Sequence, residues 1–188
     1  MSNLSDYFVK SGLDKGMETL LVDAFSERKH LKKGEFLIRE GEICQFLTFN
    51  ESGLIRHFFY GVKEEITRWV SLENNFCTSL ASFINQTPSV ESLQAISDTH
   101  LLCISKDRWK YLYTNHELVR NFWTSNIEYL YTGMEERLYS LLALPASERY
   151  QLMLRNYPEF NLMVPDKYLA SMLGIQPRHL SRLRANKK

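Results

Sequence analysis

Arginine side chains are concentrated in a short segment near the C-terminus. Arg178 and Arg182 lie about one helical turn apart, and they are interleaved with the apolar residues Leu180 and Leu183. If the segment is a helix, the two arginines lie on the face opposite the leucines. Exposed guanidinium groups bind phosphate oxygens, and they also contact guanine bidentately in the DNA major groove. The chemistry that this pattern favours is recognition of double-stranded DNA.

Two short helices joined by a glycine turn would position these side chains. We expect the first helix over Asp166–Leu173, with Asp166 as its cap, and the second from Pro177 to about Ala185. Gly174 can adopt the left-handed conformation that ends a helix. Because apolar residues at helical spacing would form a shared core, the segment predicts a helix-turn-helix motif.

The polar residues of this motif divide into two predicted roles. We expect Arg178 and Arg182 to contact bases, with Ser181 beside them. Phosphate contacts position a protein on DNA without reading its sequence. The residues expected to make them are Lys167, Gln176, His179, Arg184, Lys187 and Lys188.

The charge distribution also favours an anionic partner for this end of the chain. Residues 165–188 hold six Lys or Arg and one Asp, whereas the whole chain of 188 residues has a net charge of only +1. The rest of the chain is therefore mildly acidic. A basic tail on an acidic body is typical of nucleic-acid binding; a solvated basic terminus without a partner is the alternative.

A long helix is predicted over Glu117–Leu144. Its apolar residues recur every three or four positions, which is the helical period. Its length, about 42 Å at 1.5 Å per residue, exceeds what one small domain can cover. We therefore expect a dimer seam, and burial within one chain is the alternative. The residues assigned to the dimer helix are Val119, Trp123, Ile127, Leu130, Met134, Leu138 and Leu141.

Short strands are predicted upstream of the long helix. After amphipathic helical segments within residues 3–26, runs of aromatic and β-branched residues are separated by turn signals from Lys29 to Ser105. These runs predict an antiparallel sandwich or barrel of about eight strands. Between Asn74 and Val90 the alternation stops, and a helical turn is expected over Thr78–Phe83. Loops on a rigid scaffold often carry a ligand site.

The composition indicates a folded cytoplasmic protein. Hydrophobic residues make up 44% and charged residues 24% of the chain. No apolar run is long enough to span a membrane, and the N-terminus is not typical of a signal peptide. Three scattered cysteines, Cys44, Cys77 and Cys103, fit buried thiols in a reducing compartment rather than a disulfide framework, a zinc site or an iron–sulfur site.

Motifs of common enzyme classes are absent from the sequence. The five histidines are isolated, and there is no P-loop, nucleophile elbow or HExxH motif. A metal-dependent enzyme on a barrel would need clustered histidines and carboxylates on facing strands. We therefore expect no enzymatic activity, no bound metal and no cofactor.

The order of these elements resembles the CRP/FNR family of bacterial transcription regulators, and most of all the short members found in Bacteroidetes-type bacteria. The resemblance extends from about Leu31 to Lys188. It is carried by Lys33-Gly34-Glu35, Gly41-Glu42, Phe76–Phe83, Leu101–Lys106, Val164–Ala170 and Leu180–Arg184. It implies an α+β chain in three parts. Residues 1–115 would form a cyclic-nucleotide-binding-like sensor, an antiparallel β-barrel of jelly-roll type with N-terminal helices. Residues 116–144 would form the dimerisation helix and residues 145–188 a helix-turn-helix DNA-binding domain.

The sequence departs from the cyclic-nucleotide-binding members where the ligand would lie. Those members carry Gly-Glu and then Arg-Ser, whereas this chain has Thr78-Ser79 and, at about the second position, Ser89-Val90. No cationic residue lies in Glu73–Asp98, so a buried cyclic phosphate would lack a counter-charge within this segment. Arg56 or Arg68 could reach in from neighbouring strands, but alternation does not show which face they occupy. Regulation by cyclic AMP or cyclic GMP is therefore not expected. Family members also usually continue into a β-hairpin wing, whereas this sequence ends at Lys188, and both a wingless variant and a shortened chain stay open.

The sensor interior could still take a small effector. Mostly apolar residues with hydroxyl groups suit a weakly charged or apolar ligand. Alternatively, side chains fill the space and the sensor is constitutive. The candidate pocket residues are Phe76, Thr78, Ser79, Leu80, Phe83 and Ser89.

These observations predict a homodimeric regulator that binds double-stranded DNA at two half-sites about one helical turn apart. The family resemblance adds RNA polymerase as a partner. The alternative is a ligand-sensing or protein-interaction module whose C-terminal helices do not read DNA. The two hypotheses differ in salt dependence, since phosphate contacts make DNA affinity fall steeply with salt.

Overall fold

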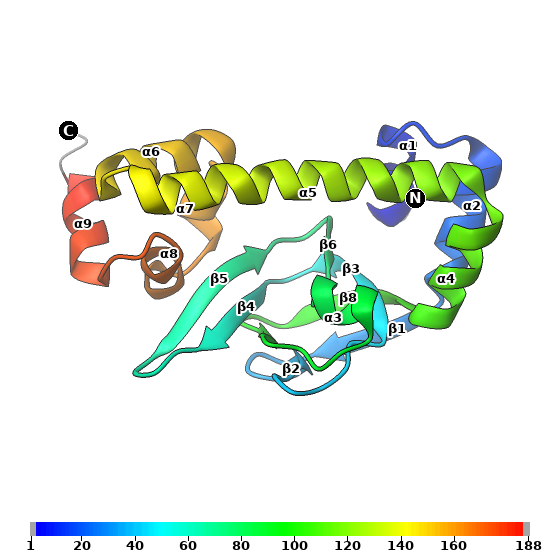
Figure 1. Ribbon diagram of the computed structural model, residues 1–188, viewed down its shortest axis with the longest axis horizontal. Coiled ribbons are helices and arrows are strands. Elements are labelled where there is room, and N and C mark those ends of the chain that lie inside the picture. The colour runs from blue at the N-terminus through cyan, green and yellow to red at the C-terminus, as the bar shows by residue number, and fades with distance from the viewer. Residues whose placement is uncertain (1–2, 186–188) are drawn as a thin grey trace.

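The computed structural model describes residues 3–185, in which two β-sheets lie beside one long helix (Figure 1). The strands are β1 (Glu27–Leu31), β2 (Phe36–Ile38), β3 (Phe46–Ser52), β4 (Ile55–Tyr60), β5 (Glu65–Ser71), β6 (Asn75–Cys77), β7 (Ser92–Ala95) and β8 (Thr99–Ser105). The helices are α1 (Asn3–Lys10), α2 (Lys15–Ala24), α3 (Leu80–Asn85), α4 (Lys106–Asn115), α5 (Glu117–Ala143), α6 (Ala146–Asn156), α7 (Phe160–Met163), α8 (Asp166–Met172) and α9 (Pro177–Ala185).

Two four-stranded antiparallel sheets make up the predicted sensor. Their strand orders are β1-β8-β3-β6 and β2-β7-β4-β5, so strands far apart in the sequence are paired. Ile55, Leu93 and Leu101 are among the fully buried side chains of these strands. Each such side chain stabilises the fold by roughly 1.5–3 kcal/mol. The predicted fold class is confirmed, with the refinement that the two sheets form an open sandwich and not a closed barrel.

The N-terminal helices and the first half of α5 cover the outer face of the first sheet. An aromatic cluster joins them to it: the Tyr7 ring of α1 lies 5.7 Å from Phe49, 5.2 Å from Phe76 and 6.4 Å from Phe122, all in edge-on geometry. Edge-on pairs add to the apolar burial of each ring. This layer fixes α5 against the sensor.

The C-terminal helices share a second hydrophobic core with the second sheet. Val70 of β5 is fully buried in the same cluster as Leu169 of α8 and Leu180 of α9. The ring of Trp69, also on β5, lies 4.9 Å from Phe160. The strand β5 is at the edge of its sheet, and α8 packs along it (Figure 1). The expected DNA-binding segment is thus packed directly on the sensor.

Several local predictions differ from the structure. The expected loop before α3 contains the three-residue strand β6, which pairs with β3 and is too short for its alternation to be visible in the sequence. The helical turn expected over Thr78–Phe83 is α3, displaced to Leu80–Asn85. Asp166 is not a cap, because Pro165 occupies that position and Asp166 is the first helical residue. The helix α7 was not predicted, since its four residues are too few to show a period.

Candidate nucleic-acid interface and sensor interior

The helices α8 and α9 form the predicted helix-turn-helix. Gly174 has a φ of +65°, the left-handed conformation that the sequence predicted for it. The N–H of Ile175 then donates a 3.0 Å hydrogen bond to the carbonyl of Ala170, which closes the turn. Leu169, Ala170 and Leu180 are fully buried at the contact between the two helices. The small Ala170 therefore lies where the helices approach each other.

The outward face of this motif is polar and accessible. Gln176, Arg178, His179, Ser181 and Arg182 are all exposed. Within residues 3–185, no ion pair involves either Arg178 or Arg182. The Ser181 hydroxyl donates a 3.2 Å hydrogen bond to the carbonyl of Pro177 on its own helix. The two predicted base-contacting arginines are thus free to meet a partner.

The predicted phosphate-contacting residues are placed differently from one another. Arg184 is held within the protein: its Nη1 is 2.6 Å from Asp166 Oδ1 and its Nε donates to Asn161 Oδ1 at 3.1 Å. The Lys167 ammonium lies 4.6 Å from the centre of the Tyr168 ring and is exposed. Lys187 and Lys188 lie outside the described residues. Arg184 therefore ties α9 to the helices before it, a contact that the sequence did not reveal.

Two contacts join α8 to the sensor. The backbone N–H of Thr67 in β5 donates a 2.9 Å hydrogen bond to Ser171 Oγ. The guanidinium of Arg56 in β4 is 4.5 Å from the Tyr168 ring of α8 and 4.1 Å from the Phe58 ring. The first contact satisfies an outward N–H of an edge strand. The second places a cation against an aromatic ring, which is attractive when desolvated.

The sensor interior holds a polar network that the sequence analysis did not identify. Arg68 Nε donates to Glu91 Oε2 at 2.9 Å, and its Nη2 lies 3.2 Å from Oε1, so the pair is bidentate. His57 is buried; its Nε2 is 2.8 Å from Ser71 Oγ and its Nδ1 is 3.3 Å from Arg68 Nη2. Glu91 is only 6% exposed. An ionised carboxylate in this place needs the guanidinium as its partner.

The environment of this network controls its protonation. Burial opposes ionisation of Glu91, but the adjacent His57 and Arg68 outweigh it and lower the pKa of this carboxyl to about 2. Burial, followed by the charge of Arg68, lowers the pKa of His57. Glu91 is therefore ionised at neutral pH, and burial favours the uncharged form of His57.

A β-bulge directs Arg68 into the sensor. His57 is paired with Trp69 and Phe58 with Thr67, so Arg68 is the extra residue between them. A bulge re-aims side chains, and here the neighbours of Arg68 contact the C-terminal helices while Arg68 contacts Glu91. The alternation of residues left the direction of Arg68 undecided, since a bulge breaks the period of two.

The predicted pocket residues do not all lie together. Ser79 Oγ and Ser89 Oγ are 2.8 Å apart, and Ser89 donates to the carbonyl of Glu91 at 2.7 Å. Thr78 donates to the carbonyl of Phe46 at 2.9 Å. The hydroxyl groups of these three residues are thus bonded to the protein itself.

The apolar members of the predicted pocket pack toward the helices. Phe76 belongs to the aromatic cluster with Tyr7, because its strand neighbour Cys77 faces the opposite side. Phe83 is fully buried, with its ring 6.5 Å from Trp123 of α5, and Leu80 is half-buried. Phe76 therefore does not face the same space as Ser79 and Ser89.

The predicted dimer helix has two different halves. Val119 is fully buried against the sensor, and Trp123 packs 4.9 Å from Trp109. Further along the helix, the residues of the apolar stripe become exposed to solvent. Ile127 is half-buried, and Leu130, Met134, Leu138 and Leu141 are 47%, 56%, 57% and 39% exposed. Exposed apolar stripes of this extent are typical of interaction surfaces.

In residues 3–185, no three His, Cys, Asp or Glu side chains are grouped as metal ligands would be. None of the helices in that range is long and apolar enough to cross a bilayer. Cys44, Cys77 and Cys103 are buried free thiols.

Comparison with known proteins agrees with this architecture. Residues 28–116 match the family model of the cyclic nucleotide-binding domain. Among curated proteins, no sequence matches this chain.

Solved structures of bacterial regulators share the fold. FixK2 from Bradyrhizobium japonicum has a TM-score of 0.74 at 15% identity, over 85% of this chain and 83% of its own. A transcriptional regulator of the crp/fnr family from Eubacterium rectale has a TM-score of 0.69 at 18% identity, over 96% and 87%. CLP from Xanthomonas campestris, described as a c-di-GMP responsive global regulator, has a TM-score of 0.68 at 14% identity, over 89% and 90%. The resemblance noted in the sequence is confirmed at the level of the fold.

Proposed function

We propose that this chain, which has a cyclic nucleotide-binding domain in the fold of CRP/FNR regulators, is a homodimeric, DNA-binding transcription regulator. Residues 1–115 are the sensor, residues 116–144 the dimerisation helix and residues 145–188 the DNA-binding domain. The observation that carries the proposal is the free arginine pair on α9. Arg178 and Arg182 are exposed and without ion pairs in the described chain, while Leu180 on the opposite face anchors the helix.

In this proposal α9 enters the major groove. Arg178 and Arg182 contact base edges with Ser181 beside them, and Lys167, Gln176, His179 and Lys187 contact phosphates. Arg184 has a second role, because its ion pair with Asp166 fixes the orientation of α9.

Dimerisation would follow from the exposed half of α5. Two copies of the stripe from Leu130 to Leu141 would cover each other and place two α9 helices on two half-sites. The protein would act in the cytoplasm, with RNA polymerase as a further partner implied by the family.

We further propose that cyclic AMP is not the signal. The hydroxyls of Ser79 and Ser89 are bonded to each other, and Arg68 is already paired with Glu91. A cyclic phosphate would have to displace this carboxylate. These polar side chains of the interior already have partners within the protein. This arrangement suits an effector other than cyclic AMP, or no effector.

The decisive experiment is selection of bound sequences from a random DNA duplex pool without added ligand. The wild type is expected to enrich an inverted repeat, and Arg178→Ala/Arg182→Ala is expected to lose it. Arg108→Ala removes an exposed arginine from α4, at the far end of α5 (Figure 1), and serves as the matched control.

Failure of the selection has a defined consequence. If the wild type enriches nothing at low salt, the selection is repeated with added cell extract, which would supply a missing effector. Enrichment there supports an effector-dependent regulator. No enrichment there contradicts DNA reading and favours the protein-interaction module.

A further inference from the structure

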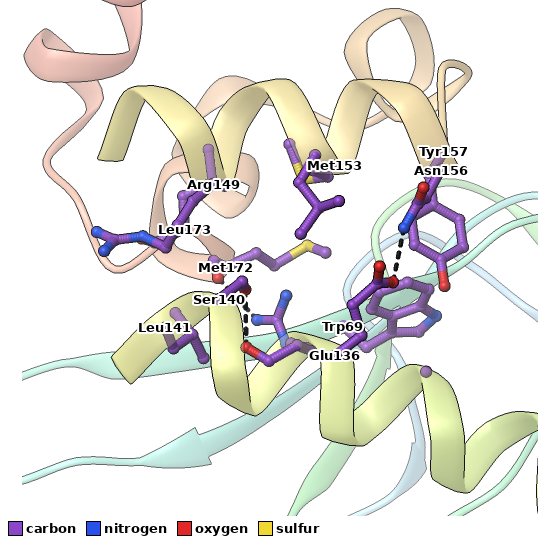
Figure 2. A pocket seen from close by; sticks show the side chains of 13 residues that line it. Trp69, Glu136, Ser140, Leu141, Arg149, Met153, Asn156, Tyr157, Met172 and Leu173 are labelled. Atoms are coloured by element: carbon purple, nitrogen blue, oxygen red, sulfur yellow. Dashed lines mark hydrogen bonds between the residues drawn. The ribbon is translucent and has the colours of Figure 1, made fainter. Parts of the chain in front are cut away.

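A small cavity lies where the sensor meets the DNA-binding helices. It is bordered by α5, α6, α8 and β5 and has a volume of about 50 Å³, with roughly 470 Å³ of free space when its open mouth is included. A water-sized group needs about 10–15 Å³, so the inner part holds about four such groups. Figure 2 shows the largely apolar wall, formed by Trp69, Leu141, Met153, Tyr157, Met172 and Leu173.

Two arginines line this cavity and converge on the end of α8. Arg137 Nη2 donates to the carbonyl of Met172 at 2.7 Å. Arg149 Nε donates to the carbonyl of Leu173 at 3.0 Å, and its Nη1 to the carbonyl of Leu144 at 2.7 Å. A helix C-terminus offers only about half a negative charge. Two guanidinium groups at one such end leave an excess of positive charge.

No carboxylate of the described chain neutralises Arg137. None of the ion pairs within residues 3–185 includes it. Glu136 lines the same cavity and its Oε2 accepts a 2.7 Å hydrogen bond from Asn156 (Figure 2), but within residues 3–185 it forms no ion pair with Arg137. The nearby Arg68 repels Arg137 and is itself paired with Glu91.

The electrostatic state of Arg137 is correspondingly unfavourable. Burial, followed by the charge of Arg68, lowers the pKa of this guanidinium to about 10. A buried charge without a counter-charge is costly, and an external anion would remove that cost.

We propose that this cavity is a binding site for a small organic carboxylate, whose charged group contacts Arg137 and whose apolar body lies against Trp69, Leu141 and Met153. The site is separate from the interior of the sensor sandwich. Because both arginines also hold α8, an occupant would stiffen the joint between sensor and DNA-binding helices.

Benzoate is a suitable probe, with benzamide as a neutral molecule of nearly the same shape. Full-length protein is labelled with ¹⁵N-tryptophan, and the indole N–H signals are followed during titration. The chain has three tryptophans, and Trp69→Phe assigns the one in the cavity. We expect benzoate to shift the Trp69 signal saturably and to leave Trp109 and Trp123 unmoved, since those two pack together near the sensor. Benzamide is expected to have no effect.

Variants separate charge from shape. Arg137→Gln can still donate to the carbonyl of Met172 but has no charge, and it should weaken benzoate binding by at least about tenfold. Arg137→Lys keeps the charge and should retain binding within about tenfold. Arg155→Gln removes an exposed arginine of α6 that does not line the cavity and should change nothing.

The proposal is overturned if benzoate does not shift the Trp69 signal, if benzamide shifts it equally, or if Arg137→Gln binds as the wild type does. Should a variant fail to fold, the benzoate and benzamide titrations of the wild type still decide. The titration contains no DNA. A negative titration would therefore leave the proposed DNA binding untouched, and a failure of DNA binding would leave this site untouched.

Discussion

The backbone N–H of Thr67 in β5 donates a 2.9 Å hydrogen bond to the hydroxyl oxygen of Ser171 in α8. This bond joins the edge strand of the sensor to the first helix of the helix-turn-helix. The next residue on the strand, Arg68, is bonded to Glu91 inside the sensor. The interior network and α8 therefore contact adjacent residues of one strand, and a shift of β5 would move both contacts.

Loss of this bond should loosen α8. Ser171→Ala leaves the N–H of Thr67 without its acceptor, and an unsatisfied buried donor costs about 1–3 kcal/mol. We expect a lower unfolding midpoint in urea and faster hydrogen exchange at the Thr67 amide. Ser181→Ala, in which the lost hydroxyl bonds only to its own helix, is the control and should match the wild type. Equal exchange in Ser171→Ala would contradict the assigned coupling.

Acid should destabilise the protein through Glu91. The folded protein holds the pKa of this carboxyl at about 2, below its unfolded value of about 4.3. Its contribution is therefore fully present above the unfolded pKa and is lost as pH falls from about 5 toward 2. The expected loss is on the order of 3 kcal/mol.

Urea unfolding at a series of pH values from about 7 to about 2.5 would measure this loss of stability. Glu91→Gln should be less stable at neutral pH and show a flatter profile in the acid range, since it has no proton to gain there. Glu64→Gln, at an exposed turn position, should keep the wild-type profile. A wild-type profile in Glu91→Gln would show that Glu91 does not titrate as described.

Arg182 and Arg184 should behave differently although both are arginines of α9. Arg182→Ala removes a free side chain and should weaken specific DNA binding by about 1–3 kcal/mol without lowering the melting temperature. Arg184→Ala breaks the 2.6 Å ion pair with Asp166 and the hydrogen bond to Asn161. It should lower the melting temperature as well as affinity. Calorimetry and fluorescence anisotropy on the two variants make the comparison; identical effects would refute the distinction.

A charge on the exposed stripe of α5 should prevent dimer formation. Leu138 is 57% exposed, and burying a glutamate in its place between two copies would be strongly unfavourable. Sedimentation is expected to give a dimer for the wild type and a monomer for Leu138→Glu. Leu162→Glu is the matched control, because Leu162 is 87% exposed on α7 but lies off the stripe. A monomeric wild type would remove the dimer from the proposal.

Cyclic AMP should leave the protein unchanged. A ligand that binds only the folded state raises stability by RT ln(1 + [L]/Kd), so even weak binding is visible at millimolar ligand. We expect no shift of the melting temperature with cyclic AMP, because Glu91 already occupies the guanidinium of Arg68. Saturable stabilisation by cyclic AMP would contradict this.

Local patterns in the sequence were enough for the order of the longer elements, though not for β1, β6 and α7. The glycine turn at Gly174 and the helix start at Pro177 were predicted at the right residues, since positive φ and fixed φ are properties of single residue types. The long helix was predicted within one residue at its C-terminal end, because its apolar period repeats over many turns. Alternation likewise predicted six of the strands; β1 was not among them, and β6 was too short for its alternation to show.

Contacts between residues far apart in the sequence became visible only in the folded chain. The ion pair of Arg68 and Glu91 joins residues 23 apart, and the bond of Thr67 and Ser171 joins residues 104 apart. The spacing of apolar residues shows which of them share a face of a helix or strand. It does not show which other element packs on that face. That is why Phe76 was assigned to the wrong side of its sheet, and why the partner of Arg184 was missed. The longer elements and their order could be predicted because they depend on neighbouring residues. The joint between the β-sandwich and the C-terminal helices could not, because it depends on packing across the whole chain.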